Sequence, residues 1–230
     1  MKRSLFFMLF LNAFAGCLIA QNSPIIYSME DFRFKRVRDG LYTTQNLKLS
    51  DIQGTPYLVT DFISGKIVTS DGSAVTNIPL RYNAFTDDLE FKKGDDVFII
   101  DPKSIVKKAE FGGAVFSYMS YFSGGKIHDG FLKILTEGKA TLLARYSVGF
   151  MPKEDVKPFI EPKPARFKAA AKENFITFEG TPAKSFSNKK GLLELFGEKK
   201  GEMEAFISKN NLSVKDDDQL ILIVKHYNTL

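Results

Sequence analysis

The sequence lacks tryptophan and has a single cysteine, Cys17, among its 230 residues. One cysteine cannot form an intramolecular disulfide, so we expect the burial of apolar side chains to stabilise the fold without one. Beyond the N-terminus, no apolar run approaches the ~20 residues that a membrane-spanning helix requires. The 22 phenylalanines are the main large apolar residues, and we expect them to fill a core.

The motifs of common catalytic sites are also missing. There is no Gly-x-Ser-x-Gly nucleophile motif, no phosphate-binding glycine loop and no His-Glu-x-x-His zinc motif. The two histidines, His128 and His226, have no partner at a metal-ligand spacing, so we expect both at the surface. These absences predict a protein that is not an enzyme and that holds no metal or cofactor.

Positive and negative charges are nearly balanced, with 32 Lys and Arg against 27 Asp and Glu. So small an excess predicts no nucleic-acid partner. The one dense basic stretch, Arg33–Arg38, contains four cations and could contact an anionic membrane surface or a glycan. We favour the alternative, an edge strand whose charges block pairing with other chains.

The first 20 residues have the pattern of a secretory signal peptide. Lys2 and Arg3 precede an apolar run over residues 5–14, and small residues follow that run. The run is too short to span a ~30 Å hydrocarbon core. The pattern predicts export, with cleavage after Ala20 and a location in the periplasm or at the outer membrane of a Gram-negative bacterium.

Cys17 gives a second interpretation of this segment. Residues 14–17, Phe-Ala-Gly-Cys, loosely resemble the lipobox of bacterial lipoproteins, in which the cysteine becomes a lipidated N-terminus. Phe14 stands where an aliphatic residue is usual, and Leu18 and Ile19 follow where a polar tether is usual. We therefore favour ordinary cleavage after Ala20, with a lipid anchor at Cys17 as the alternative.

Residues 21–150 predict an antiparallel β body. Short β-type segments recur at intervals of roughly 8–12 residues and are separated by Gly or Asp-Gly turns, one of them ending at Gly130, as in sandwiches and barrels. No helical segment long enough for a parallel crossover lies between them. The sequence thus predicts a β-sandwich or barrel within an α+β chain, with strands at residues 57–63, 66–69, 78–82, 88–92, 97–101, 105–111, 114–122, 131–136 and 140–148.

The composition changes after residue 150. Four prolines within residues 151–171 predict a strap or linker that does not pair regularly. Residues 172–230 then predict a β-hairpin over 174–178 and 183–186, followed by three helices. The helices would bury Leu192, Leu195 and Phe196, then Met203, Phe206 and Ile207, and finally Leu220, Ile223, Val224 and Tyr227.

Periodicity alone leaves two interpretations of the last segment, because the five apolar residues 220–224 also fit a buried strand. Ser213 with Asp216 three residues later predicts a capping box, and this signal favours the helix. We expect the three helices to pack on the sheet, since helices this short are marginal alone.

Carboxylates are clustered at residues 87–90. Asp88 and Glu90 alternate along a predicted strand and point to one face, where such a pair could serve calcium binding or glycan hydrolysis. A glycan hydrolase also needs a second carboxylate across a cleft. We expect these carboxylates, like those at 95–96 and 216–218, to lie in solvated turns or in the first turn of a helix.

Two similar tetrapeptides, Leu-Arg-Tyr-Asn and Ala-Arg-Tyr-Ser, lie in predicted strands. If these strands are neighbours in a barrel, Arg81 and Arg145 could share a face and bind an acidic head group, with Tyr82 and Tyr146 beside them. In the alternative that we favour, the tyrosines face the core and the arginines cover its rim.

Five segments resemble an arrangement in exported Bacteroidota proteins of unassigned function. They are Gly54-Thr55-Pro56-Tyr57-Leu58, Pro79-Leu80-Arg81-Tyr82-Asn83, Asp88-Leu89-Glu90-Phe91, Asn188-Lys189-Lys190-Gly191-Leu192-Leu193 and Val224-Lys225-His226-Tyr227-Asn228. The resemblance implies bacterial export and one continuous fold. It carries no catalytic residue and no activity.

These observations together predict a non-catalytic protein of the cell envelope. In the version that we rank first, the β body offers a surface for another envelope protein, and the basic stretch Arg33–Arg38 or the helical tail makes the contact. In the second version the body is a barrel that binds a small apolar acid or lipid, with Arg81 and Arg145 near the head group. A glycan hydrolase that uses Asp88 and Glu90 is the last alternative.

Overall fold

The computed structural model describes residues 34–36, 47–154 and 163–230. The predicted signal segment, Cys17 and most of the basic stretch Arg33–Arg38 lie outside the described residues. From that stretch only strand β1 (Phe34–Arg36) is described, and it pairs antiparallel with β5 (Asp96–Ile100). β1 is the end strand of its sheet, which is the position that the edge-strand interpretation requires.

Nine further strands complete the main sheet: β2 (Ile63–Thr69), β3 (Ala74–Asn83), β4 (Asp88–Lys93), β6 (Val106–Phe111), β7 (Ala114–Ser123), β8 (Lys126–Thr136), β9 (Ala140–Ser147), β12 (Ala171–Phe178) and β13 (Ala183–Phe186). Their order is β1-β5-β4-β3-β2-β6-β7-β13-β12-β9-β8, and β7 also pairs with β8. That extra pairing closes β7, β13, β12, β9 and β8 into a five-stranded barrel. The predicted barrel-like β body is confirmed.

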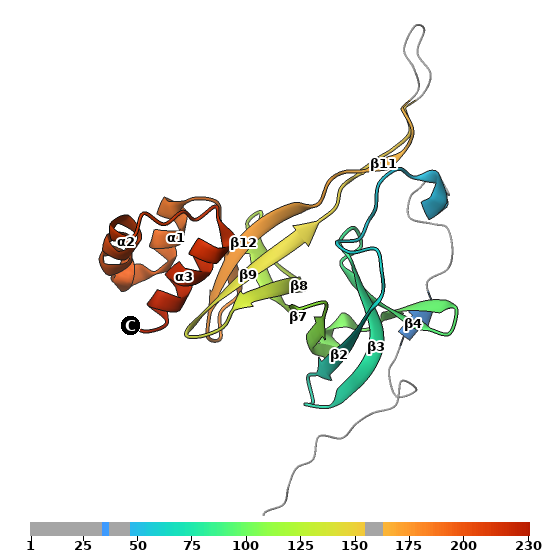
Figure 1. Ribbon diagram of the computed structural model, residues 1–230, viewed down its shortest axis with the longest axis horizontal. Coiled ribbons are helices and arrows are strands. Elements are labelled where there is room, and N and C mark those ends of the chain that lie inside the picture. The colour runs from blue at the N-terminus through green and yellow to red at the C-terminus, as the bar shows by residue number, and fades with distance from the viewer. Residues whose placement is uncertain (1–33, 37–46, 155–162) are drawn as a thin grey trace, which may run out of the picture.

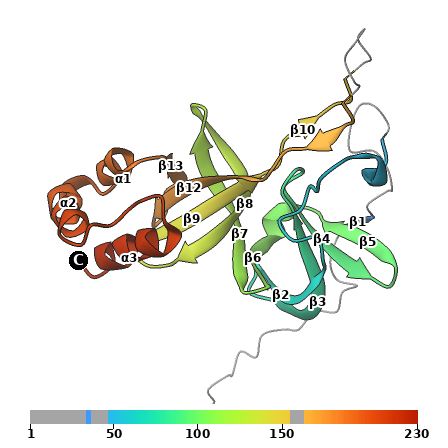
Figure 2. The same cartoon turned by 45° about the horizontal axis from the view of Figure 1, so that its top comes forward.

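The other strands continue from β7 as an open part of the same sheet. In Figures 1 and 2 the barrel lies between this open part, which holds β2 to β6, and the C-terminal helices. Phenylalanines contribute to the cores of both parts, as expected from the composition: Phe91 is fully buried in the open part and Phe175 in the barrel.

Along strands β9 and β12, alternate apolar side chains point to opposite faces of the sheet and belong to two different clusters. Leu143 lies opposite Phe175, and both belong to a cluster to which all five barrel strands contribute. Their neighbours Leu142 and Ile176, also opposite each other, belong to the cluster that the helices cover. Successive side chains of a strand point to opposite faces, so this pair of strands supplies both the barrel interior and the platform for the tail.

The predicted hairpin over 174–178 and 183–186 exists as β12 and β13, and it is built into the barrel. β12 pairs with β9 along its whole length, and β13 pairs with β7 through Ala183 and Lys184. The β13–β7 pair is parallel, whereas the sequence predicted only antiparallel pairing. It arises because the hairpin inserts between β9 and β7, which leaves β13 running in the same direction as β7.

The two ends of the proline-rich strap lie side by side, although the prolines argued against regular pairing. β10 (Phe150–Met151) pairs antiparallel with β11 (Arg166–Phe167), and neither strand contains a proline. Gln53 is hydrogen-bonded to Ala165 and Phe167 through its backbone, which joins β11 to the segment before β2. Residues 155–162 lie outside the described residues.

Three helices follow the barrel as predicted: α1 (Lys189–Leu195), α2 (Lys200–Lys209) and α3 (Asp217–Tyr227). The apolar run 220–224 is therefore helical. The expectation that the tail packs on the sheet is also confirmed, because one cluster joins Leu142 and Ile176 of the barrel with Leu192, Met203, Ile207, Leu220 and Ile223 of the helices.

The prediction that Ser213 opens α3 is wrong. The N-cap is Asp216, whose Oδ1 accepts a hydrogen bond from the Gln219 backbone N–H at 2.9 Å. Ser213 instead donates its own backbone N–H to Gln219 Oε1 at 2.8 Å. Asp216 followed three residues later by Gln219 is an equally good capping pattern, so the local signal placed the cap three residues too early.

Candidate functional site

Arg81 and Glu90 face each other on β3 and β4. Arg81 Nη2 lies 2.6 Å and Nε 3.2 Å from Glu90 Oε2, and Asn83 Nδ2 donates to Glu90 Oε1 at 2.9 Å. The Glu90 side chain is only 1% exposed, so the expectation of a solvated carboxylate is wrong here. Its burial is possible because a guanidinium and an amide satisfy both oxygens.

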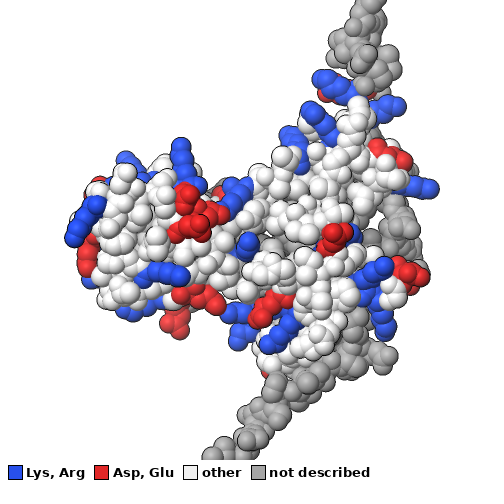
Figure 3. Space-filling view, in the orientation of Figure 1, with Lys and Arg blue, Asp and Glu red and all other residues white. Residues whose placement is uncertain are grey.

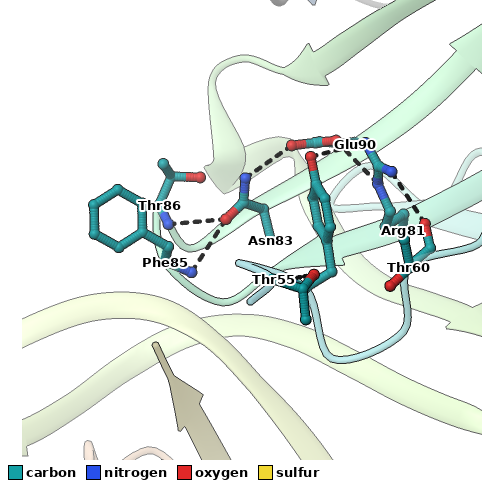
Figure 4. A network of polar contacts seen from close by, with 8 residues as sticks. Thr55, Thr60, Arg81, Asn83, Phe85, Thr86 and Glu90 are labelled. Atoms are coloured by element: carbon teal, nitrogen blue, oxygen red, sulfur yellow. Dashed lines mark hydrogen bonds and ion pairs between the residues drawn. The ribbon is translucent and has the colours of Figure 1, made fainter. Parts of the chain in front are cut away.

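The same guanidinium fastens the segment before β2 to the sheet. Its central carbon lies 3.6 Å from the centroid of the Tyr57 ring and 4.1 Å from that of Phe62, so the cation contacts both rings. Nη1 donates to the Thr60 carbonyl at 3.0 Å and Nη2 to the Tyr57 hydroxyl at 2.9 Å (Figure 4). Arg81 therefore has its charge neutralised by Glu90 and most of its donors occupied.

Asn83 shapes the turn that joins β3 to β4. Its Oδ1 accepts hydrogen bonds from the backbone N–H groups of Phe85 and Thr86 at 3.1 and 3.2 Å, while Glu90 holds its Nδ2 (Figure 4). Asp87, the last residue of the turn, has a φ of 56°, a left-handed conformation that Asp tolerates better than most residues. The turn thereby brings the Asp87 carboxylate to β8.

Asp87 links the open part of the sheet to the barrel. The Tyr82 hydroxyl donates to Asp87 Oδ1 at 2.7 Å, and the Phe131 N–H donates to Oδ1 and Oδ2 at 3.2 and 3.3 Å. A Cβ on Gly130 would lie 2.7 Å from Asp87 Oδ2, so glycine leaves room for the carboxylate. Burial raises the pKa of Asp87, and burial together with the charge of Asp87 raises the pKa of Tyr82.

The contact of Asp87 with β8 corrects two expectations from the sequence. Asp87 is partly buried and hydrogen-bonded rather than solvated. Gly130 does not interrupt a strand, because β8 runs continuously from Lys126 to Thr136 and the glycine accommodates a neighbouring side chain. Asp88 is also partly buried and forms an ion pair with Lys103 at 2.9 Å.

Three of the four residues predicted to bind a ligand line a single pocket. Arg81, Tyr82 and Tyr146 border a space of about 310 Å³ between the open part of the sheet and the outer face of the barrel. Its size lies at the lower end of the about 300–1,000 Å³ that is usual for small-molecule sites. We call this space the inter-sheet pocket, and its apolar walls include Leu58, Ile63, Phe111, Ala114 and Phe116.

The fourth predicted residue, Arg145, does not line the inter-sheet pocket. Its guanidinium carbon lies 5.1 Å from the centroid of the Tyr121 ring, and its position on β9 is opposite Glu173 of β12. The Arg145 Nε atom is buried and has no hydrogen-bond partner among the described residues. The structure therefore places the two arginines in separate clusters.

Lys133 is a lining residue that the sequence reasoning missed. It lies on β8, opposite Phe116 of β7 and Ala144 of β9, and it is half-buried. No ion pair or hydrogen bond engages its ammonium among the residues that the structure describes. The available signal was a lone cation inside the apolar run 131–135. The remaining charged residue of the pocket, Asp61, is exposed.

A larger, shallower groove of about 780 Å³ opens where the β8–β9 and β12–β13 turns meet at one end of the barrel. Met119 and residues 177–182 form part of its lining, and its charged residues Lys139 and Glu179 are both exposed. The inter-sheet pocket is the better candidate site because it is less open and because buried core side chains of two sheet regions, Tyr82 and Phe116, form part of its lining.

The histidines lie apart from both spaces. His128 is exposed and stacks on Tyr121 at a centroid distance of 5.6 Å, whereas His226 is half-buried and stacks on Phe206. Within residues 34–36, 47–154 and 163–230, no cluster of three metal-ligating side chains is found. None of the helices in these ranges is long and apolar enough to cross a membrane.

On the face that Figure 3 shows, Lys and Arg side chains are interspersed with Asp and Glu over the helices and the sheet. This mixture does not form the continuous basic track that a nucleic acid would need on that face.

No protein-family model, curated protein or solved structure matches this chain. Its function therefore has to be inferred from the geometry of its own side chains.

Proposed function

We propose that this chain is a non-catalytic binding protein of the bacterial cell envelope and that the inter-sheet pocket holds a small molecule. The observation that carries the proposal is the construction of the pocket from core side chains of both sheet regions. Two of its polar residues, Arg81 and Tyr82, are held by Glu90 and Asp87. A preformed and mostly apolar space in which these two polar groups are fixed suits binding more than proton transfer.

The proposed location depends on the N-terminal segment. Lys2 and Arg3, the apolar run 5–14 and the small residues after it support export, and the resemblance to exported Bacteroidota proteins supports the same compartment.

The test uses N-phenyl-1-naphthylamine, a neutral apolar dye whose fluorescence rises when it leaves water. We expect saturable binding to the mature chain. Ala114→Phe should abolish it, because the added ring would fill the pocket beside Phe111, which lies opposite Ala114. Ala205→Phe, on the exposed surface of α2, is the matched control and should bind the dye normally. Equal binding by both variants would contradict the proposal.

A second candidate function, contact with another envelope protein, is favoured by the β7–β8 hairpin. Phe122 and Ile127 lie opposite each other near its tip and are 45% and 63% exposed. Figure 2 shows this ribbon extending beyond the barrel. Adjacent large apolar side chains on a projecting ribbon are typical of a surface that a partner covers.

Photo-crosslinking in the native host tests this second candidate. A crosslinking residue in place of Ile127 should yield one discrete adduct, and Phe122→Ser should abolish that adduct. A crosslinker in place of Leu222, which is 53% exposed on α3, is the control position. The same adducts at both positions, or none at Ile127, would exclude a specific contact at the hairpin.

A further inference from the structure

We infer that the ligand of the inter-sheet pocket is a small apolar molecule with one anionic group and that Lys133 pairs with this group. The inference rests on the proposed function, namely that the pocket binds a small molecule at all. It adds the chemical class of the ligand and the residue that selects it.

The position of Lys133 is fixed by the barrel. Its strand has β7 on one side and β9 on the other at this point, with Phe116 and Ala144 as its register partners. The side chain leaves β8 on the face that also carries Phe131, which belongs to the core beneath the pocket. Lys133 is half-buried beside apolar walls, and no described protein group engages its ammonium, so a bound anion would supply the missing ion pair.

Arg81 cannot take this role, which the ligand-binding interpretation of the sequence gave it. Its guanidinium is paired with Glu90 at 2.6 Å, and that carboxylate is 1% exposed. A ligand anion that drew Arg81 away would leave a buried charge unpaired, which is strongly unfavourable. The Arg81–Glu90 pair therefore contributes no net charge to the pocket.

Asp61 does not neutralise Lys133. Among the described ion pairs there is none between these two residues, and Asp61 is exposed to solvent. Solvent and salt screen the charge of an exposed carboxylate. Lys133 is thus the cation of the pocket that no described carboxylate pairs with, and the walls at Leu58, Ile63 and Phe116 are apolar.

The experiment compares two eight-carbon competitors of N-phenyl-1-naphthylamine, octanoate and octan-1-ol, at neutral pH. Octan-1-ol is the more hydrophobic of the two, so a pocket without charge selectivity would favour the alcohol. We expect octanoate to displace the dye at a concentration about tenfold lower, the factor that one charge-assisted hydrogen bond supplies.

Three substitutions assign the preference to Lys133. Lys133→Met keeps the apolar stem and should lose the preference for octanoate while it still binds the dye, and Lys133→Arg should retain the preference. Lys126→Met, at the exposed tip of the same strand, is the control and should behave as the unmodified chain. Lys133→Gln serves as the second neutral variant if Lys133→Met does not fold.

The two proposals fail in different ways. Equal displacement by octan-1-ol and octanoate, or an undiminished preference in the neutral variants, would overturn the inference and leave the proposed function standing. Absence of dye binding, or binding that Ala114→Phe does not block, would overturn the proposed function itself.

Discussion

The side-chain amide of Asn228 forms both hydrogen bonds of a backbone-like pair with Ala140, which lies 88 residues earlier in the chain. Its Oδ1 accepts from the Ala140 N–H at 2.7 Å, and its Nδ2 donates to the Ala140 carbonyl at 2.9 Å. Asn228 is also the C-cap of α3. One side chain thus joins the end of the helical tail to the first residue of β9.

Asn228→Ala should destabilise the protein by about 1–3 kcal/mol, because it leaves the polar backbone groups of the fully buried Ala140 without partners. Urea unfolding followed by circular dichroism measures this change. Asn210, whose amide contacts only the exposed end of α2, is the control, and Asn210→Ala should cost about 0.5 kcal/mol or less. Equal losses in both variants would show that the Ala140 contact contributes nothing.

Arg81→Met should destabilise the protein by about 3–5 kcal/mol, since it leaves the Glu90 carboxylate buried and unpaired. Adding Glu90→Gln to Arg81→Met should recover part of this loss, because glutamine is neutral and can still accept from Asn83. The unfolding free energies of the two single variants and the double variant measure the coupling. Strict additivity would contradict a buried ion pair.

Asp87 should make stability depend on pH. Its pKa in the folded protein is raised above 3.8, so the folded state holds the proton more tightly than the unfolded state. The free energy of unfolding should then fall as pH rises from about 3.8 through the raised pKa, and remain constant above it. Asparagine at position 87 does not titrate, so the Asp87→Asn variant should not lose stability as pH rises. Asparagine also adopts the left-handed backbone conformation that this position requires.

The measurement for Asp87 is urea unfolding of both proteins across this pH window. The stability of Asp87→Asn relative to the unmodified chain should increase as pH rises toward neutrality. Parallel curves would show that the carboxylate titrates in the folded protein as it does in the unfolded chain.

Intact-mass measurement of the protein recovered from its host tests the N-terminal predictions. We expect an N-terminus at Gln21, with processing unchanged by Cys17→Ser. A diacylglyceryl mass on Cys17 would instead establish the lipoprotein alternative. A chain that retains Met1 would contradict export.

The strands and helices were predictable because their signals are local. Alternation places Leu143 and Leu142 on opposite faces of β9 whatever the tertiary fold, and Met203 and Ile207 lie one turn apart on the buried face of α2. Gly130 was misinterpreted for the opposite reason. When only the neighbouring residues are considered, a glycine in a β-type segment indicates a turn. In the structure, glycine is needed at position 130 because the Asp87 carboxylate, which comes from a distant turn, leaves no room for a Cβ.

The candidate site was predictable only in part. The paired Arg-Tyr segments drew attention to Arg81, Tyr82 and Tyr146, which the pocket brings together. Lys133 was missed and Arg145 was misplaced relative to the pocket because both depend on how the barrel packs against the open part of the sheet. Sequence spacing within a strand does not contain that information.

The parallel pairing of β13 with β7 has a consequence for how the chain folds as it appears from its N-terminus. Strands β2 to β8 can pair with their sequence neighbours as soon as they are synthesised, whereas the pairing of β7 with β13 waits for the last strand of the sheet. Until then the inner face of the β7–β8 ribbon, with Tyr121 and Leu132, has no cover from β12 and β13. Closure of the barrel is therefore a late, long-range event, and a chain cut before residue 183 presents an apolar ribbon that favours aggregation.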